Sequence, residues 1–472
     1  MRLGKIQNIH FVGIGGIGMS GIAEVLLNLG YKISGSDLAL SEITAHLAQR
    51  GAIIYEGHHP QNVQDAEVLI YSSAVSEDNP EVKEAQRLKI PVIKRAEMLG
   101  ELMRLKFGVA IAGTHGKTST TSLTGAVLTA AGLDPTLIIG GKLRSLKTNA
   151  RLGASDYMVA EVDEFDRSLQ TIIPAIAIIT NIEADHLECY NDLDDLRETF
   201  LNFANRVPFY GEVICCSDNE GVREILNRIK RRVASYGFEN HPDITARKIE
   251  FSEGGSQFEV VWQGKSLGTV RLKIPGRHNI LNALAAIAAG LELDVTFPKI
   301  REGLESFSGV NRRFEITGRI NDILVVDDYA HHPTEIAATL RGAREGWPQR
   351  RLIAVFQPHL YSRTKNFFRE FARSFSDADV VFITEIYPAR EEPIEGVSGE
   401  LIANSARNLP DLEVVYVPSK SDAARKTTEI LRPGDMVITI GAGDVWRINE
   451  QLLQALKSKY GQTKEQKAEM DA

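Results

Sequence analysis

Apolar, β-rich runs alternate with helix-like stretches along the whole chain, and this alternation limits the folds it can adopt. The run HFVGIG precedes the helix-like stretch MSGIAEVLLNLG, and FGVAIAGT precedes SLTGAVLTAAG. Four more runs of the same kind follow late in the sequence: ILVVDDYAHHP, RLIAVFQPH, DVVFITEIY and MVITIGAG. Such a pattern is typical of parallel sheets whose strands are joined by crossover helices. We therefore predict an α/β protein with mostly parallel sheets.

The chain is too long for a single hydrophobic core. Its 472 residues correspond to about three domains at about 150 residues each. A charged helix-like segment ends near residues 104–108, where a new buried strand begins, and the polar sequence SGVNRRFE interrupts the pattern near residues 308–313. We predict three α/β domains at residues 1–107, 108–311 and 312–472, the last of which ends in a polar tail.

Composition and charge exclude several classes of protein. Apolar residues make up 43% of the chain and charged residues 25%, which is the balance of an ordinary globular protein. The net charge of -8 argues against a chain that coats nucleic acid or an anionic membrane, because both need a basic face. No segment resembles a signal peptide or a membrane span. We predict a cytoplasmic protein with no nucleic-acid or membrane partner, which must hold any anionic ligand locally.

The first glycine-rich loop lies directly between a strand and an apolar helix. Gly13, Gly15 and Gly18 form G-x-G-x-x-G after the strand HFV, and Asp37 follows at the end of the next strand. The glycines let backbone N–H groups approach a diphosphate at a helix N-terminus, and the carboxylate can bind ribose hydroxyl groups. The pattern therefore predicts a nucleotide diphosphate. It leaves NAD, FAD and a UDP-sugar open, because all three present a diphosphate and a ribose.

The second glycine-rich loop opens the middle domain. The strand FGVAIAG runs into THGKTST, residues 114–120, and then into a helix. Lys117 is placed to neutralise the β- and γ-phosphate oxygens of a nucleotide, and the Thr118 hydroxyl is placed to bind Mg²⁺. A strict Walker A motif has glycine at the position of Ile111, so the loop departs from that motif. It keeps the lysine and the hydroxyl residue that act on the phosphates and Mg²⁺. We predict that this loop binds ATP.

Two later strands end in groups that suit a metal ion. The strand YMVAEVDEFD ends in Glu161, Asp163, Glu164 and Asp166, and the strand AIAIITNIEADH ends in Asn181, Glu183, Asp185 and His186. Carboxylates and an imidazole at strand ends beside a phosphate-binding loop can hold Mg²⁺. Only a few of these groups can reach one metal ion, and the sequence alone does not choose among them.

The two loops together limit the classes of reaction that the protein can catalyse. A dehydrogenase has no use for the second loop, and a kinase has no use for the first. A ligase uses both, because forming an amide from a carboxylate requires phosphoryl activation and the carboxylate can be carried on a nucleotide. An NAD-dependent oxidoreductase is favoured by the first loop alone. A non-catalytic nucleotide-sensing module would not need the groups at positions 161 and 186.

Nine motifs between residue 10 and about residue 450 together resemble the Mur ligase family: GIGGIGMSGIAE, SSAV, GTHGKTST, EVDEFD, TNIEADH, GRHNILNALAA, GVNRRFE, DDYAHHPTE and QPHLYSRT. The first and the eighth resemble its alanine-adding branch. The resemblance implies a Rossmann-like UDP-binding domain, a central P-loop ATPase domain and a C-terminal Rossmann-like domain that close around the substrates. It implies an ATP-dependent ligase of peptidoglycan precursor synthesis, which joins L-alanine to the carboxylate of UDP-N-acetylmuramate through an acyl phosphate and releases ADP and phosphate.

The resemblance also implies roles for individual residues. The diphosphate loop would hold UDP-N-acetylmuramate with Gly13, Gly15, Gly18, Asp37, Ser72 and Ser73. The ATP site would comprise Gly113, Thr114, His115, Gly116, Lys117, Thr118, Ser119, His278 and Asn279. Mg²⁺ would be bound by Thr118, Glu161 and His186. Lys117, Arg313, Asp328 and His331 would be catalytic, and His359 and Arg363 would contact substrate in the alanine pocket.

The absence of one lysine indicates which branch of the Mur ligases the sequence resembles. Other Mur ligases resemble one another in having a carbamylated lysine after the Asp-His motif, but no lysine lies between His186 and Arg206 here. The alanine-adding branch also lacks this lysine, so its absence agrees with that branch and leaves a second metal site open. The recycling ligase, which attaches a whole tripeptide to the same nucleotide, is an alternative whose N-terminal loop departs from GIGGIGMSG. The sequence does not indicate an oligomeric state.

Overall fold

The computed structural model describes residues 3–141, 149–184, 189–389 and 391–461. The chain divides into two compact units. The first unit contains Met1–Ile249, Phe258–Arg271 and Ile280–Ser308, and the second contains Glu250–Gln257, Leu272–Asn279 and Gly309–Ala472. The chain forms three sheets, and most pairs of neighbouring strands in them run parallel.

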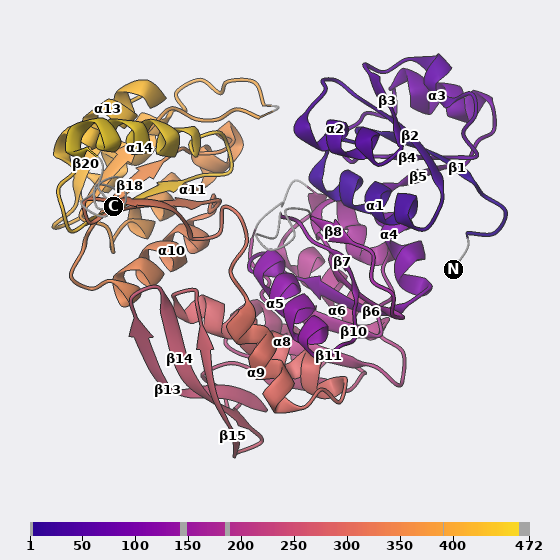
Figure 1. Ribbon diagram of the computed structural model, residues 1–472, viewed down its shortest axis with the longest axis horizontal. Helices are drawn as coiled ribbons and strands as arrows, with labels where there is room; N and C mark the ends of the chain where they lie inside the picture. The colour runs from indigo at the N-terminus through magenta and orange to yellow at the C-terminus, as the bar shows by residue number, and fades with distance from the viewer. Residues whose placement is uncertain (1–2, 142–148, 185–188, 390, 462–472) are drawn as a thin grey trace, which may run out of the picture. The chain divides into compact units, whose positions relative to one another are not determined.

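The first sheet, in the N-terminal part of the chain (Figure 1), is wholly parallel. Its strands are β1 (Asn8–Val12), β2 (Lys32–Asp37), β3 (Ile53–Glu56), β4 (Val68–Tyr71) and β5 (Val92–Lys94). The connecting helices are α1 (Ile17–Asn28), α2 (Glu42–Gln49), the 3-10 helix η1 (Pro60–Val63), α3 (Pro80–Arg87) and α4 (Arg95–Arg104). The strand order β3-β2-β1-β4-β5 reverses direction at β1. The carboxyl end of β1 is therefore the crevice where open α/β sheets bind ligands.

The second sheet has ten strands in the order β15-β14-β13-β12-β11-β10-β6-β9-β7-β8. The strands are β6 (Phe107–Ala112), β7 (Thr136–Ile138), β8 (Ala150–Arg151), β9 (Tyr157–Glu161), β10 (Ile176–Ile179), β11 (Glu212–Cys216), β12 (Val233–Tyr236), β13 (Ile244–Ser252), β14 (Gly255–Trp262) and β15 (Lys265–Leu272). The helices are α5 (Lys117–Ala130), the 3-10 helix η2 (Phe165–Thr171), α6 (Leu193–Asn205), α7 (Glu220–Leu226), α8 (Arg277–Glu292) and α9 (Phe297–Ser306). Strand β6 lies between β9 and β10 and runs parallel to both, so the three carboxyl ends share one edge.

The third sheet belongs to the second unit. Its strands are β16 (Glu315–Ile320), β17 (Ile323–Asp328), β18 (Arg351–Phe356), β19 (Val380–Ile383), β20 (Glu413–Tyr416) and β21 (Asp435–Ile440). Its helices are α10 (Pro333–Gly346), α11 (Tyr361–Ser374), α12 (Gly399–Ala406), α13 (Lys420–Ile430) and α14 (Arg447–Tyr460). The order is β16-β17-β21-β18-β19-β20, and only β16 is antiparallel to its neighbour.

Alternate residues of the third sheet belong to two separate apolar clusters. Val326, Ala354 and Ile438 pack in one cluster with α10, α11 and α12. Val325 and Ile353 pack in the other with α13 and α14, which lie side by side in Figure 1. Because both faces of the sheet are covered, the middles of its central strands are apolar on both faces, which is why the late runs of the sequence show no regular alternation of polar residues.

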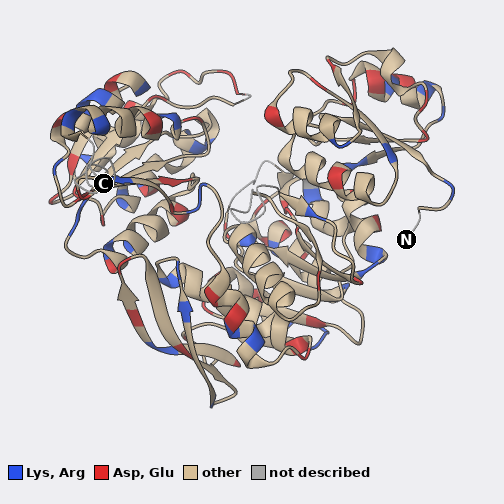
Figure 2. Cartoon of the chain, in the orientation of Figure 1, with Lys and Arg blue, Asp and Glu red and all other residues tan. Residues whose placement is uncertain are grey.

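The prediction of an α/β protein with mostly parallel sheets is confirmed. The domain boundaries at residues 107/108 and 311/312 stay predictions. Among the described residues, no helix combines the length and the apolar character needed to cross a membrane. Figure 2 shows Lys and Arg interspersed with Asp and Glu over the ribbon, so anionic ligands must be held by particular groups rather than by a basic face.

Candidate active site

The first glycine-rich loop connects the carboxyl end of β1 to the first turn of α1. Gly13 has a φ of +80°, and a Cβ at this position would lie 3.3 Å from the Ser72 side chain. The backbone N–H of Gly15 donates a hydrogen bond of 2.8 Å to the Asp37 carboxylate. The structure thus brings Gly13, Gly15, Asp37 and Ser72 together, and Ser73 lies exposed beside them.

The first turn of α1 contains Gly18 and has backbone N–H groups available for an anion. Gly16 occupies the N-cap position and makes no side-chain cap, and the first turn has no acidic residue. The first N–H groups of a helix lack partners within the helix, and this end of the helix dipole is positive. The turn therefore suits the diphosphate that the sequence predicts.

A buried carboxylate behind this loop was not found from the sequence. Glu81 of α3 is fully buried, and its Oε2 accepts a hydrogen bond of 2.5 Å from the Ser36 hydroxyl. Burial raises the pKa of Glu81, but hydrogen bonds from His10, Ser36 and Asn62 outweigh it, so the pKa is lowered overall. The Ser36 carbonyl in turn accepts the N–H of Gly13 at 2.8 Å. Glu81 therefore helps to fix the strand end against which the loop rests.

The second glycine-rich loop connects β6 to α5, and the segment after β10 fixes its backbone. Gly113 has a φ of +137°, and a Cβ there would collide with the Thr180 hydroxyl. Asn181 Oδ1 accepts the N–H of His115 at 2.7 Å, and Asn181 Nδ2 donates to the His115 carbonyl at 3.0 Å. The Thr114 hydroxyl accepts the N–H of Glu183 at 2.9 Å. The sequence placed Asn181 only among candidate metal-site groups, whereas here both of its polar atoms hold the backbone of the second glycine-rich loop.

The start of α5 packs against α8. Gly116 has a φ of +79°, and a Cβ there would lie 2.7 Å from Asn282 Oδ1, which also accepts a hydrogen bond of 3.1 Å from the Thr120 hydroxyl. Asn282 lies in the motif GRHNILNALAA, but its contact with the loop was not predicted, because the two segments are far apart in the chain. His278 and Asn279 precede it on α8 and belong to the second unit, so their contact with ATP stays a prediction.

Lys117 is held by carboxylates inside the loop. Its Nζ donates to Glu164 Oε2 at 2.7 Å and to the Gly113 carbonyl at 2.6 Å. The Glu164 side chain is 1% exposed and that of Lys117 is 12% exposed. Burial lowers the pKa of Lys117, but the charges of Glu164, Asp163 and Glu161 outweigh it and raise the pKa above its ordinary value. Lys117 is therefore charged at neutral pH, and Glu164 sets the position of that charge.

Two of the three predicted Mg²⁺ ligands lie side by side. The Thr118 hydroxyl donates to Glu161 Oε2 at 2.9 Å, and the N–H of Gly140 donates to the same oxygen at 2.9 Å. Oxygen donors beside a phosphate-binding loop fit the preference of Mg²⁺ for hard ligands. His186, the third predicted ligand, lies outside the described residues. Ser119, the last predicted residue of the loop, is half-buried on α5.

In the second unit, Asp328 ends β17 and is 6% exposed. Its two oxygens accept the N–H groups of Phe314 and Ala330, each at 2.8 Å. Burial raises the pKa of Asp328 to about 6, against the opposing effects of the Arg313 charge and the two N–H groups. Arg313 lies over the Tyr329 ring, 5.3 Å from its centroid. Asp328 thus ties the segment that carries Arg313 to the end of β17, and its catalytic role stays a prediction.

Aromatic rings line the same edge of the third sheet. The ring centroids of His331 and His359 are 6.0 Å apart, and His359 stacks on Tyr387 at 5.8 Å. The Nδ1 of His331 lies 3.3 Å from the Glu335 carboxylate. Arg363 in the first turn of α11 is 7% exposed. The predicted residues follow the carboxyl ends of β17 and β18, whereas Tyr387 follows β19 and carries no motif that would have pointed to it.

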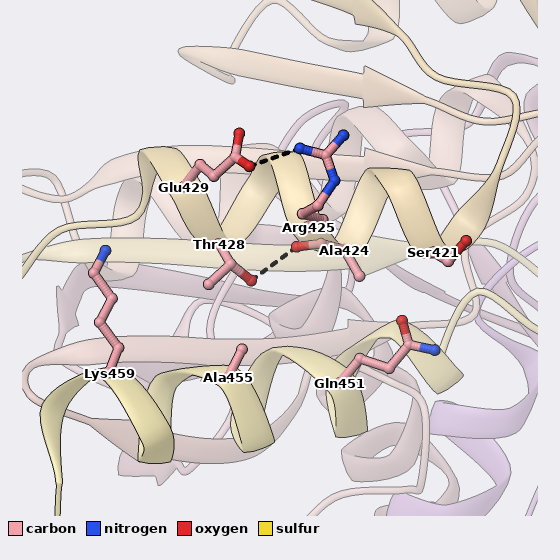
Figure 3. Close-up of a pocket in the computed structure, with 8 residues that line it drawn as sticks. All are labelled: Ser421, Ala424, Arg425, Thr428, Glu429, Gln451, Ala455 and Lys459. Carbon is pink, nitrogen blue, oxygen red and sulfur yellow. Dashed lines mark hydrogen bonds and ion pairs between the residues drawn. The ribbon is translucent and has the colours of Figure 1, made fainter.

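A groove of about 500 Å³ lies elsewhere in the second unit, between α13 and α14 (Figure 3). It is lined by Ser421, Ala424, Arg425, Thr428, Glu429, Gln451, Ala455 and Lys459. Arg425 and Glu429 form an ion pair across one turn of α13, at 2.7 Å. None of these side chains is a predicted site residue, so the groove is separate from the candidate active site.

Family models match three successive parts of the chain. The Mur ligase family catalytic domain matches residues 8–107, the Mur ligase middle domain matches residues 111–290, and the Mur ligase glutamate ligase domain matches residues 312–443. The chain belongs to the Mur ligase family.

Similar Mur ligases cover nearly the whole chain. The UDP-N-acetylmuramate–L-alanine ligase of Geobacter sp. (strain M21) is 52% identical over 96% of this chain and 99% of its own length. The crystal structure of the UDP-N-acetylmuramate–alanine ligase of Thermotoga maritima has a TM-score of 0.80 and 30% identity, covering 96% of this chain and 99% of that one. A murein peptide ligase of Psychrobacter arcticus has a TM-score of 0.70 and 26% identity, covering 95% and 98%.

We expect Glu164→Gln to destabilise the ligand-free protein by about 3 kcal/mol, because removing one partner of a buried ion pair leaves the other uncompensated. Added ADP should raise the melting temperature more in this variant than in the wild type, since its phosphates supply the missing negative charge to Lys117. Differential scanning calorimetry with and without ADP measures both effects.

Asp163→Asn is the matched control, because Asp163 lies 3.7 Å from Lys117 and its side chain is 42% exposed. An exposed pair contributes less than about 1 kcal/mol. Equal stability of the two variants would contradict the role given to Glu164.

The raised pKa of Asp328 predicts a pH dependence of unfolding. A carboxyl group whose pKa rises from 3.8 to about 6 on folding contributes stability that is fully present below about pH 4 and is lost as the pH rises through 6. Asp328→Asn removes this contribution, so the wild type should lose stability relative to the variant between pH 4 and about pH 7. Urea unfolding of both proteins across this range tests it, and parallel pH profiles would contradict it.

Proposed function

We propose that the chain is an ATP-dependent ligase that joins L-alanine to the carboxylate of UDP-N-acetylmuramate in peptidoglycan precursor synthesis. The observation that carries the proposal is that one compact unit holds two separate glycine-rich loops, each between a parallel strand and the start of a helix, which suit a diphosphate and ATP. The similarity over nearly full length to ligases of that name supports it. We also propose that the enzyme works in the cytoplasm, where ATP is supplied.

We propose that Lys117 acts in the first step of the reaction. The carboxylate of UDP-N-acetylmuramate attacks the γ-phosphorus of ATP, which gives an acyl phosphate and ADP. In the transition state negative charge is spread over the γ-phosphoryl oxygens and develops on the oxygen of ADP that departs, so a positive charge already fixed beside these oxygens lowers the barrier. Lys117 fits this role because Glu164 and the Gly113 carbonyl hold its ammonium group before ATP arrives.

We propose Thr118 and Glu161 as ligands of Mg²⁺. Their oxygens are in hydrogen-bond contact at the start of α5, beside the residue that meets the phosphates. Mg²⁺ would neutralise charge on the phosphate oxygens of ATP when it is bound. The N–H of Gly140 donates to the same Glu161 oxygen as the Thr118 hydroxyl, so the protein itself orients this carboxylate.

The second step forms the amide bond. The amine of L-alanine attacks the carbonyl carbon of the acyl phosphate, and the C–O bond to phosphate breaks. We propose that His331, His359 and Arg363 surround the alanine. Arg363 suits the alanine carboxylate, because a guanidinium group binds a carboxylate through two parallel hydrogen bonds. The stacked rings of His359 and Tyr387 would form one rigid side of this alanine pocket.

A recycling ligase that attaches a tripeptide is the second candidate, because a murein peptide ligase shares the fold over nearly the whole chain. An amino-acid panel separates the two. Phosphate release in the presence of ATP and UDP-N-acetylmuramate should be stimulated most by L-alanine. Glycine should follow at about 10- to 200-fold lower kcat/KM, because one methyl group is worth about 1 to 3 kcal/mol. A tripeptide or D-glutamate that outcompetes L-alanine would reject the proposal.

The bond that breaks in ATP gives an independent test. When the muramate carboxylate carries ¹⁸O, one labelled oxygen should appear in the released phosphate, since the bridging oxygen of the acyl phosphate comes from the carboxylate. Mass spectrometry of the phosphate measures this. Unlabelled phosphate, or AMP among the products, would exclude the acyl phosphate route, because an acyl adenylate would release pyrophosphate instead.

A further inference from the structure

Arg95 lies at the edge of the first sheet where the glycine-rich loop begins. It is the first residue of α4 and follows β5 directly. Because all five strands are parallel, the carboxyl end of β5 is at the same edge as those of β1, β2 and β4. These three strands lead to Gly13, Asp37 and Ser72. Arg95 is thus the one cation that begins a helix at this edge of the sheet, among the residues that the structure describes.

The Arg95 side chain reaches back over the first turn of α1. A Cβ on Gly18 would lie 3.1 Å from Arg95 Nη1 and 3.2 Å from its Cδ. Both distances are shorter than ordinary carbon contacts, so a side chain at position 18 would push the guanidinium group away. The third glycine of this loop therefore allows Arg95 to rest directly on the helix turn that presents the free N–H groups.

Nothing within the described part of the protein neutralises this charge. No carboxylate there forms an ion pair or hydrogen bond with Arg95, although its side chain is partly buried. The acids on the two helices concerned have other partners: Glu24 of α1 lies 3.7 Å from Arg50, and Glu97 of α4 accepts the N–H of Lys94 at 3.1 Å. An arginine with no acidic partner keeps its N–H donors available for an anionic ligand.

We propose that Arg95 binds the diphosphate of UDP-N-acetylmuramate together with the first turn of α1. This inference rests on the proposed function, because it names a further contact for the same substrate. A guanidinium group matches two phosphate oxygens at once, which a helix terminus alone does not. The helix turn places N–H groups at the diphosphate from one side, and Arg95 supplies a full positive charge above Gly18.

Calorimetry with three ligands tests the proposal: uridine, UDP and UDP-N-acetylmuramate. Arg95→Gln should weaken binding of UDP and of UDP-N-acetylmuramate by the same factor, about 10- to 100-fold, which is the size expected for a hydrogen bond to a charged group. Binding of uridine should not change, because uridine has no phosphate. Arg95→Lys should lie between Arg95→Gln and the wild type, since it keeps the charge and loses the paired geometry.

Arg104→Gln is the matched control on the same helix, because Arg104 is exposed and pairs with Glu101 at 3.0 Å. This variant should bind all three ligands as the wild type does. Gly18→Ala displaces the guanidinium group without removing its charge, so it should also weaken UDP binding. Combined with Arg95→Gln it should add little, since both changes remove the same contact.

Unchanged UDP affinity in Arg95→Gln would overturn the proposal. So would a loss confined to UDP-N-acetylmuramate, because that pattern would place Arg95 at the muramate carboxylate. A wild type that binds neither UDP nor UDP-N-acetylmuramate would instead reject the proposed function. If Arg95→Gln proves unstable, Gly18→Ala and Arg95→Lys test the proposal instead. Each of these variants should bind UDP more weakly than the wild type and bind uridine as the wild type does, and unchanged UDP affinity in both would overturn the proposal.

Discussion

The candidate ATP site depends on the parallel register of β6 with its two neighbours. Ile111 of β6 is paired with Glu161 of β9, and Ala112 is paired with Ile179 of β10. This register places the Glu161 carboxylate beside the start of α5, and it places Thr180 and Asn181 against the loop backbone. A slip of one residue in either pairing would turn these side chains to the other face of the sheet. Lys117 and Thr118 have their positions because the three strands end together.

The two glycine-rich loops are joined by a short chain of contacts inside the first unit. The side-chain amide of Asn149, just before β8, donates to the Ile17 carbonyl in the first turn of α1. The Asn149 carbonyl accepts the N–H of Ile139 at 2.9 Å, and the next residue, Gly140, donates to Glu161. The helix turn that suits the diphosphate and the carboxylate that suits Mg²⁺ are therefore held by the same pair of strands, β7 and β8.

The sequence predicted those site residues that lie close together in the chain. Gly13, Gly15 and Gly18 form a motif of six residues, and Lys117 and Thr118 follow a strand directly, so loop chemistry alone identifies them. The alternation of strands and helices likewise predicted the α/β fold. The supporting contacts were not predicted, although Glu164 was named as a candidate metal-site group: Glu164 is 47 positions from Lys117, Glu81 is 45 from Ser36, and Asn282 is 162 from Thr120. Such contacts depend on the packing of distant segments, which no spacing in one sequence encodes.

Glu81 and Asp328 show why burial alone does not decide the charge of a supporting acid. Both carboxyl groups are buried, and burial raises the pKa of each. Glu81 accepts hydrogen bonds from three side chains and from the N–H of His59, and its pKa ends below the ordinary value. Asp328 accepts only two backbone N–H groups, and even with the Arg313 charge nearby its pKa ends at about 6. The number of hydrogen-bond donors that point at the carboxylate therefore decides whether its pKa lies below or above the ordinary value. Behind the first glycine-rich loop the lowered pKa keeps Glu81 anionic at neutral pH, whereas at the end of β17 the charge of Asp328 changes near pH 6.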